Sequence, residues 1–147
     1  MSRASIEYFF DNPDAQIPGE WPARTDTVSA EFLAALLEGE KVTDLDPRFA
    51  QPTKSAASIV RHLNYRYGWR IQSSKFAYCT DDGRLAFAKK YCLLPGVIKS
   101  AYVCDAEEWI DGVRTAGKIR LASARRVEAQ ANIINAWYER GAQGATT

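Results

Sequence analysis

Residues 54–95, KSAASIVRHLNYRYGWRIQSSKFAYCTDDGRLAFAKKYCLLP, decide the fold of this chain. In the first part, apolar residues recur every three or four positions, which predicts a helix over residues 53–67 that ends at Gly68. The second part predicts a β-hairpin, with strands over 75–80 and 85–94 around a turn that has Asp-Gly at its centre. The middle of the chain is therefore a helix followed directly by a hairpin.

The same stretch holds most of the positive charge. The 147-residue chain has a formal net charge of only +1. Residues 1–53 carry four Lys/Arg and ten Asp/Glu, residues 54–99 carry nine and two, and residues 100–147 carry six of each. The middle third is thus at +7 and the first third at −6. A basic helix and hairpin suit an anion, and a nucleic-acid backbone is the natural candidate.

Composition favours an ordinary globular domain. Hydrophobic residues make up 46% of the chain and charged residues 25%, which is typical of soluble proteins. No apolar run approaches the roughly 20 residues of a membrane helix, and the start, MSRASIEYFFDNPD, has no apolar segment of the secretory type. We expect a cytoplasmic protein that has no membrane partner.

The cysteine count points the same way. Cys79, Cys92 and Cys104 are an odd number without close pairing along the chain, so free thiols in a reducing compartment are expected. A zinc site that adds His62 is the weaker alternative, because structural zinc ligands usually come in closely spaced pairs. We expect no cofactor and no metal.

Further elements are predicted on the N-terminal side of the basic stretch. Residues 1–28 are rich in aromatic residues and proline, and we expect an extended arm against the domain body. A helix is predicted from Ser29 to Gly39. Val42-Thr43 is a short extended stretch that could pair with the hairpin, and residues 44–50 are typical of a short helix.

On the C-terminal side, residues 105–140 predict a helical segment with a break or bend near Gly112 and Gly117. Residues 141–147 are predicted to be a loose tail. An apolar stripe runs along the second half of this segment and consists of Val127, Ala131, Ile134 and Tyr138. The stripe packs on the domain's own core or pairs with a second copy, and we favour a homodimer.

The quoted stretches resemble a known family. Residues 36–49 (LLEGEKVTDLDPRF), 58–71 (SIVRHLNYRYGWRI) and 91–95 (YCLLP) are similar to the small winged helix-turn-helix domains of bacteriophage and prophage proteins. The resemblance implies a mostly α (α+β) protein. It would have a winged helix-turn-helix domain over residues 29–98, with the hairpin as its wing, between the N-terminal arm and the C-terminal helix.

The resemblance also implies which residues contact DNA. The candidates for base contacts lie on the helix: Lys54, Ser55, Ser58, Arg61, His62 and Tyr65. The candidates for phosphate contacts follow them along the chain: Arg66, Arg70, Lys75, Arg84, Lys89 and Lys90. Arg61 is the strongest candidate, because arginine reads guanine and because this residue lies opposite Val60 and Leu63. The ordinary alternatives are a solvated arginine and, for the hairpin lysines, protection of a strand edge.

Catalysis is not expected. The chain has one histidine and lacks a glycine-rich phosphate loop and the HExxH and GxSxG motifs. The function predicted from these features is non-enzymatic binding of double-stranded DNA, as a transcription or replication regulator of phage or prophage type.

The alternative is a small phage-type module that uses the same surface to bind and block a host protein. Acidic residues in the first third favour this alternative: Glu31, Glu38, Glu40, Asp44 and Asp46. The two hypotheses differ in electrostatics. If carboxylates neutralise Arg61, Arg66 and the hairpin lysines, the protein partner is favoured; if these cations share an exposed face, DNA is favoured.

Overall fold

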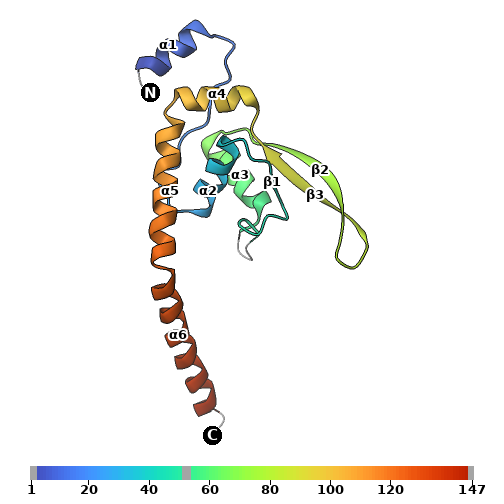
Figure 1. Cartoon of the computed structure of the whole chain (residues 1–147), viewed down its shortest axis with the longest axis vertical. Coiled ribbons are helices and arrows are strands. Elements are labelled where there is room, and N and C mark those ends of the chain that lie inside the picture. Colours follow the sequence, from blue (N-terminus) through green and yellow to red (C-terminus); the bar gives the residue numbers. More distant parts are fainter. Residues whose placement is uncertain (1–2, 51–53, 146–147) are drawn as a thin grey trace.

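A computed structural model describes residues 3–50 and 54–145 of the chain. Within them, helices and a three-stranded antiparallel sheet form a mixed α+β fold (Figure 1), as the sequence predicts. The helices are α1 (Arg3–Asp11), α2 (Val28–Leu37), α3 (Ala56–Tyr67), α4 (Pro95–Val103), α5 (Ala106–Ala122) and α6 (Ala124–Ala145). The strands are β1 (Val42–Thr43), β2 (Gln72–Cys79) and β3 (Leu85–Cys92).

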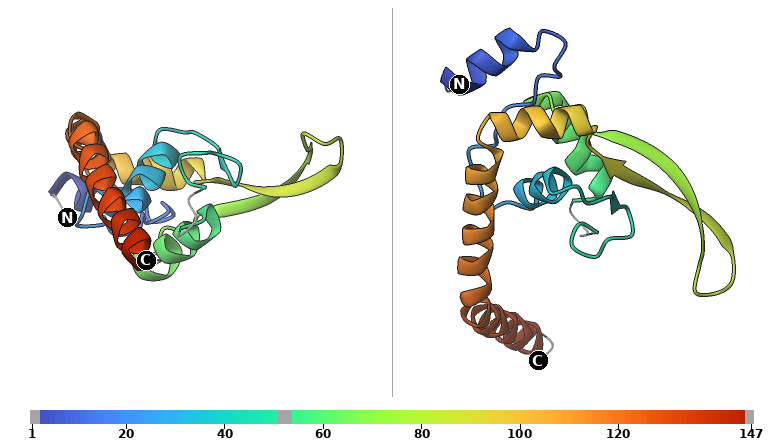
Figure 2. Two further views of the ribbon diagram at one scale, coloured as in Figure 1. Left: turned by 90° about the horizontal axis from the view of Figure 1, so that it is seen from below. Right: turned by 45° about the horizontal axis from the view of Figure 1, so that its top comes forward.

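The sheet has the order β1-β3-β2, so β3 is its central strand and β1 and β2 are its edges. The hairpin is paired from Gln72↔Cys92 to Cys79↔Leu85 and projects away from the helices (Figures 1 and 2). Its turn is closed by a hydrogen bond from Thr80 N–H to the Arg84 carbonyl at 2.8 Å. The expected pairing of Val42-Thr43 with the hairpin is confirmed, because Val42 lies opposite Tyr91.

Both ends of α3 are defined by local chemistry. The Ser55 hydroxyl accepts a hydrogen bond from Ser58 N–H and caps the helix. Thr53, at which the sequence predicts this helix to begin, lies outside the described residues. Gly68 ends the helix at φ 72°, a conformation that glycine adopts without a steric penalty. The Asn64 side chain accepts a hydrogen bond from Ile71 N–H at 2.7 Å and donates one to the Ile71 carbonyl at 3.3 Å. These two bonds fix the connection between α3 and β2.

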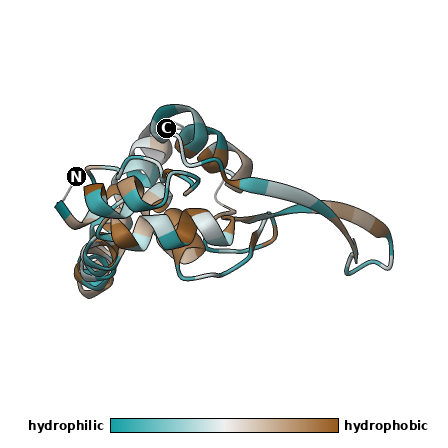
Figure 3. Ribbon diagram, turned by 90° about the horizontal axis from the view of Figure 1, so that it is seen from above, coloured by the Kyte–Doolittle hydropathy of each residue, from teal (hydrophilic) through white to brown (hydrophobic). Residues whose placement is uncertain are grey.

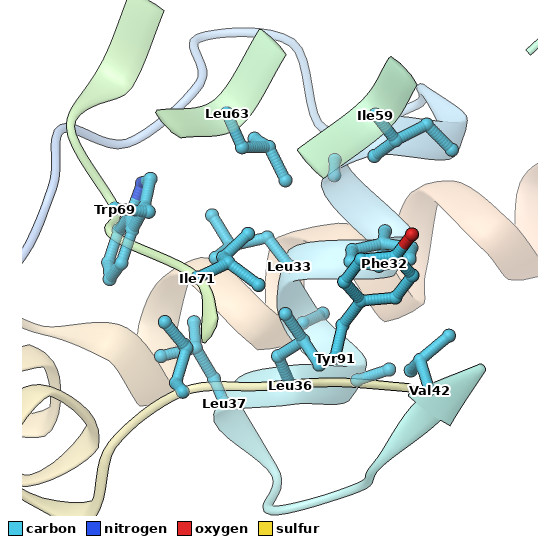
Figure 4. Close-up of a cluster of buried hydrophobic side chains, with 14 of the residues drawn as sticks. Phe32, Leu33, Leu36, Leu37, Val42, Ile59, Leu63, Trp69, Ile71 and Tyr91 are labelled. Atoms are coloured by element: carbon cyan, nitrogen blue, oxygen red, sulfur yellow. The ribbon is translucent and has the colours of Figure 1, made fainter. Parts of the chain in front are cut away.

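The core forms around α2, which is almost completely buried (Figure 4). Phe32 contacts Phe49 and Tyr91 edge to face, with ring centroids 4.9 and 6.0 Å apart. Side chains of α3, β1 and the α3–β2 connection close over the same helix, and they include Ile59, Leu63, Val42, Trp69 and Ile71. The core thus fixes α3 and the base of the hairpin relative to each other.

Tryptophans fasten the N-terminal segment to this core. Trp69 is fully buried, and its ring centroid lies 4.9 Å from that of Trp21. Its indole N–H donates to the Glu20 carbonyl at 2.7 Å. Trp21 stacks on Trp109 of α5. A Cβ atom on Gly19 would lie 2.5 Å from the carbonyl oxygen of Tyr67, so the chain passes too close to the end of α3 for any other residue. The segment therefore braces the exit of α3.

Two predicted segments are wrong in the N-terminal half. Residues 3–11 form α1 instead of extended chain, and α1 packs on α4 with Ser5 Oγ donating to the Val103 carbonyl. Residues 44–50 form turns instead of a helix. The Asp46 carboxylate accepts from Arg48 N–H and from its guanidinium, and such a local turn competes with a seven-residue helix, which is too short to be stable.

Helix boundaries differ in the C-terminal half. The strand predicted over residues 85–94 ends at Cys92. Pro95 then begins α4, since proline suits the first turn of a helix. Gly112 and Gly117 lie inside α5, which runs through them because Ile110 and Val113 pack in the core. The break falls at Ser123, whose hydroxyl donates to the Ile119 carbonyl. Residues 141–145 continue α6, so the predicted tail is wrong there.

Candidate nucleic-acid interface

The outward face of α3 carries Arg61 and Tyr65, opposite the buried stripe of Ile59, Val60 and Leu63. Tyr65 is 87% exposed. The Arg61 guanidinium makes no hydrogen bond or ion pair to any residue that the structure describes. Both side chains can reach a partner without breaking an internal contact.

The other predicted base contacts lie differently. Ser55 and Ser58 bond each other at the start of α3, so their hydroxyls are engaged locally. Lys54 and His62 border hollows between α3 and the beginning of α2. The imidazole of His62 also contacts the Tyr67 ring edge to face, with centroids 5.5 Å apart. The six predicted residues therefore divide into an outward pair, a pair that caps α3 and a pair that faces α2.

The hairpin places two lysines side by side. Lys75 of β2 lies directly opposite Lys89 of β3, and both are exposed. Lys90 is paired with Ser74 and points to the other face of the sheet. Like charges directly opposite each other destabilise a sheet, so the Lys75–Lys89 pair favours a polyanionic partner that would neutralise it.

Asp44 holds the hairpin at this point. Its carboxylate accepts from Lys89 N–H at 3.0 Å and from the Tyr91 hydroxyl at 2.9 Å. Burial, together with the hydrogen bond to Asp44, raises the pKa of Tyr91 well above its ordinary value, so the phenol remains a neutral donor. Asp44 therefore positions the backbone at Lys89, a role that its sequence neighbours do not reveal.

Three predicted phosphate contacts are already engaged. Arg70 adopts φ 54° and donates to the Ile17 carbonyl at 3.0 Å. Arg84 forms an ion pair with Asp82 in the hairpin turn at 3.2 Å. The guanidinium of Arg66 lies 5.9 Å from the ring centre of Tyr67. These residues have structural partners, and Arg70 in particular contributes to fastening the N-terminal segment.

Four acidic side chains of the first third, Glu31, Glu38, Glu40 and Asp46, pair with arginines outside α3 and the hairpin. Glu38 pairs with Arg114 at 2.7 Å, and Glu31 pairs with Arg120 of the same helix, α5. Arg48 forms ion pairs with both Glu40 and Asp46. Its hydrogen bond to Asp46 lowers the pKa of that carboxyl group. In the described part of the chain, no carboxylate of the first third pairs with a cation of α3 or the hairpin.

Exposed apolar groups form a second kind of surface. Every α6 residue whose side chain is described is exposed, and α6 extends beyond the body of the protein (Figures 1 and 2). Leu85 and Phe87, on the outer half of the hairpin, are 73% and 67% exposed. Figure 3 shows this part of the hairpin in the brown of hydrophobic residues. The sequence pattern predicts the α6 stripe but does not reveal that the apolar part of the hairpin is exposed.

Across residues 3–50 and 54–145, no group of three His, Cys, Asp or Glu side chains could hold a metal ion, so the three cysteines and His62 are not brought together. None of the helices in these ranges is both long and apolar enough to cross a membrane. Comparisons with protein-family models, with curated proteins and with solved structures found no match.

Proposed function

We propose that this protein binds double-stranded DNA through α3 and the β2–β3 hairpin. In this proposal, residues 29–98 form a winged helix-turn-helix domain with the hairpin as its wing. The order helix, short strand, helix, hairpin and the pairing of β1 with β3 support that assignment. Turns replace the short helix that the sequence predicts over residues 44–50, between β1 and α3. The cellular role that suits it is non-enzymatic control of transcription or replication, of the phage or prophage type.

One electrostatic observation carries the proposal. Arg61, Lys75 and Lys89 are exposed and make no ion pair with any described residue. Arginines outside α3 and the hairpin pair instead with Glu31, Glu38, Glu40 and Asp46. A helix fits the major groove and can reach base edges there, while lysines on an adjacent hairpin can lie along phosphates. Because no described carboxylate pairs with these three cations, DNA is favoured over a protein partner.

The hairpin lysines test the proposal. We expect the Lys75→Gln/Lys89→Gln variant to bind a mixed-sequence duplex more weakly and to lower the slope of log affinity against log salt by about 2, because each lost phosphate contact lowers it by about one. Fluorescence anisotropy of a labelled duplex measures both quantities. The matched control is Lys99→Gln/Lys118→Gln, which removes the same charge from exposed positions on α4 and α5. Equal slopes for both variants would contradict the role of the hairpin.

A second candidate function is favoured by α6. We also propose that α6 pairs with α6 of a second copy of this chain. Its exposed stripe of Val127, Ala131, Ile134 and Tyr138 repeats every three or four residues, as the seam of a coiled coil does. Residues 129–138 contain no charge. An apolar seam is complementary to its own copy across a twofold axis, and such dimers set the spacing of DNA half-sites.

Sedimentation equilibrium of the full chain tests the dimer. The native chain is expected at twice its mass of 16.4 kDa, and Ile134→Lys is expected to be monomeric because it places a charge in the seam. Asn132→Lys adds the same charge to the opposite face of α6 and should leave the dimer intact. A native chain that remains at the monomer mass at high micromolar concentration would refute this pairing.

A further inference from the structure

Two adjoining hollows lie between the beginning of α2 and the beginning of α3, and Ser29, Lys54 and His62 border both of them. Together they are called the Ser29 hollow below. Arg24 and Thr27 border one of the two, and Ser58 borders the other. Among the residues that the structure describes, neither hollow is bordered by an Asp or a Glu. The polar lining of the Ser29 hollow therefore consists mainly of hydrogen-bond donors and cations.

Ser29 is the most informative residue of this hollow. It is only 6% exposed, yet its hydroxyl makes no hydrogen bond to any described residue. It also differs from Ser100, the one described residue whose buried side-chain oxygen is both sealed from solvent and unpartnered. The Ser29 hydroxyl is therefore available to a group that enters the hollow.

The N-terminus of α2 lies at the same place. Thr27 caps the helix by accepting from Ala30 N–H, which leaves the amides of Val28 and Ser29 without intrahelical partners. Helix N-termini attract anions through these amides and the helix dipole. The carboxylates nearest in sequence are already neutralised, since Asp26 pairs with Arg24 and Glu31 pairs with Arg120.

Lys54 and His62 complete the donor set from the side of α3. The Lys54 ammonium has no ion-pair partner in the described part of the chain. The hydroxyl, the ammonium, the imidazole and the helix amides approach from two different elements. Donors from several directions match an anion with several oxygens around one centre, and a phosphate group has this geometry.

We propose that the Ser29 hollow binds a phosphate group. Ser29 and the first amides of α2 donate to its oxygens, and Lys54 supplies the neutralising charge. The binding of phosphate as such is independent of the proposed function. Only the further statement that this phosphate belongs to a DNA strand held by α3 rests on the proposed function. Inorganic phosphate or a soluble phosphate ester would present the same chemistry.

Thermal unfolding of the full chain in inorganic phosphate tests the site. Up to about 50 mM phosphate, we expect a larger rise in Tm than sodium chloride gives at the same ionic strength, because a ligand that binds only the folded state stabilises it. Ser29→Ala and Lys54→Gln should each weaken phosphate binding at least tenfold, whereas Lys99→Gln should not. An equal rise in chloride, or a phosphate effect that survives both variants, would overturn the proposal.

Duplex binding by the same variants identifies the source of the phosphate. If the hollow holds a DNA phosphate, Ser29→Ala weakens duplex binding and inorganic phosphate competes with the duplex. If it holds a free phosphate ester, Ser29→Ala loses the phosphate effect on Tm but binds duplex like the native chain. A native chain that shows the phosphate effect and binds no duplex would refute the proposed function and leave the phosphate site standing.

Discussion

Replacing Trp69 by alanine should lower the free energy of unfolding by about 3–5 kcal/mol, the usual cost of removing a buried tryptophan. The side chain is fully buried, contacts Trp21 and donates to the Glu20 carbonyl. Alanine would leave a cavity at the exit of α3 and would free the N-terminal segment from it. Urea denaturation followed by circular dichroism measures the loss.

Tyr65→Ala is the matched control for Trp69→Ala, because it removes an aromatic side chain that is 87% exposed, four residues earlier in the last turn of α3. Its effect should stay within about 0.5 kcal/mol. A loss below about 1 kcal/mol for Trp69→Ala would mean that the N-terminal segment does not brace α3. In that case the tryptophan cluster could not be what positions the helix against the hairpin.

Replacing Arg61 by alanine should weaken duplex binding by about 1–3 kcal/mol, or roughly 5- to 150-fold, which is the range for one base-reading arginine. Arg61 is exposed at the middle of α3 and no described residue neutralises it. The fold should be unaffected, since alanine favours a helix. Fluorescence anisotropy with a specific duplex measures the change, and a relaxed sequence preference should accompany it.

Arg125→Ala is the control for this change. Arg125 is an exposed arginine of α6 and forms no ion pair with any residue in the described ranges. Its loss removes the same charge far from α3 and should change duplex affinity little. If both variants bind the duplex equally, the effect is one of net charge, and α3 is not the helix that reads DNA.

The part of the fold that follows from local chemistry was predictable. Gly68 at a positive φ, the turn around Gly83 and the alternation of the strands define α3 and the hairpin from short stretches of sequence. Elements that depend on tertiary context were not predictable. Gly112 and Gly117 stay helical because α5 packs against α2, and Pro95 begins a helix instead of ending a strand.

The site shows the same division. The exposure of Arg61 follows from its helical position, which the sequence reveals. The pairing of Glu38 with Arg114 and the bond from Arg70 to the Ile17 carbonyl join residues far apart in sequence. No local pattern indicates such partners. The sequence could therefore predict which cations lie on α3 and the hairpin, but not which of them are free.

The salt dependence of duplex binding by the native chain tests the central claim most directly. A labelled mixed-sequence duplex is titrated by fluorescence anisotropy from about 50 to 200 mM salt. If α3 and the hairpin neutralise phosphates, the affinity is measurable at low salt and log affinity falls linearly and steeply with log salt. Absence of binding at about 50 mM salt, or an affinity that salt does not change, would contradict the account.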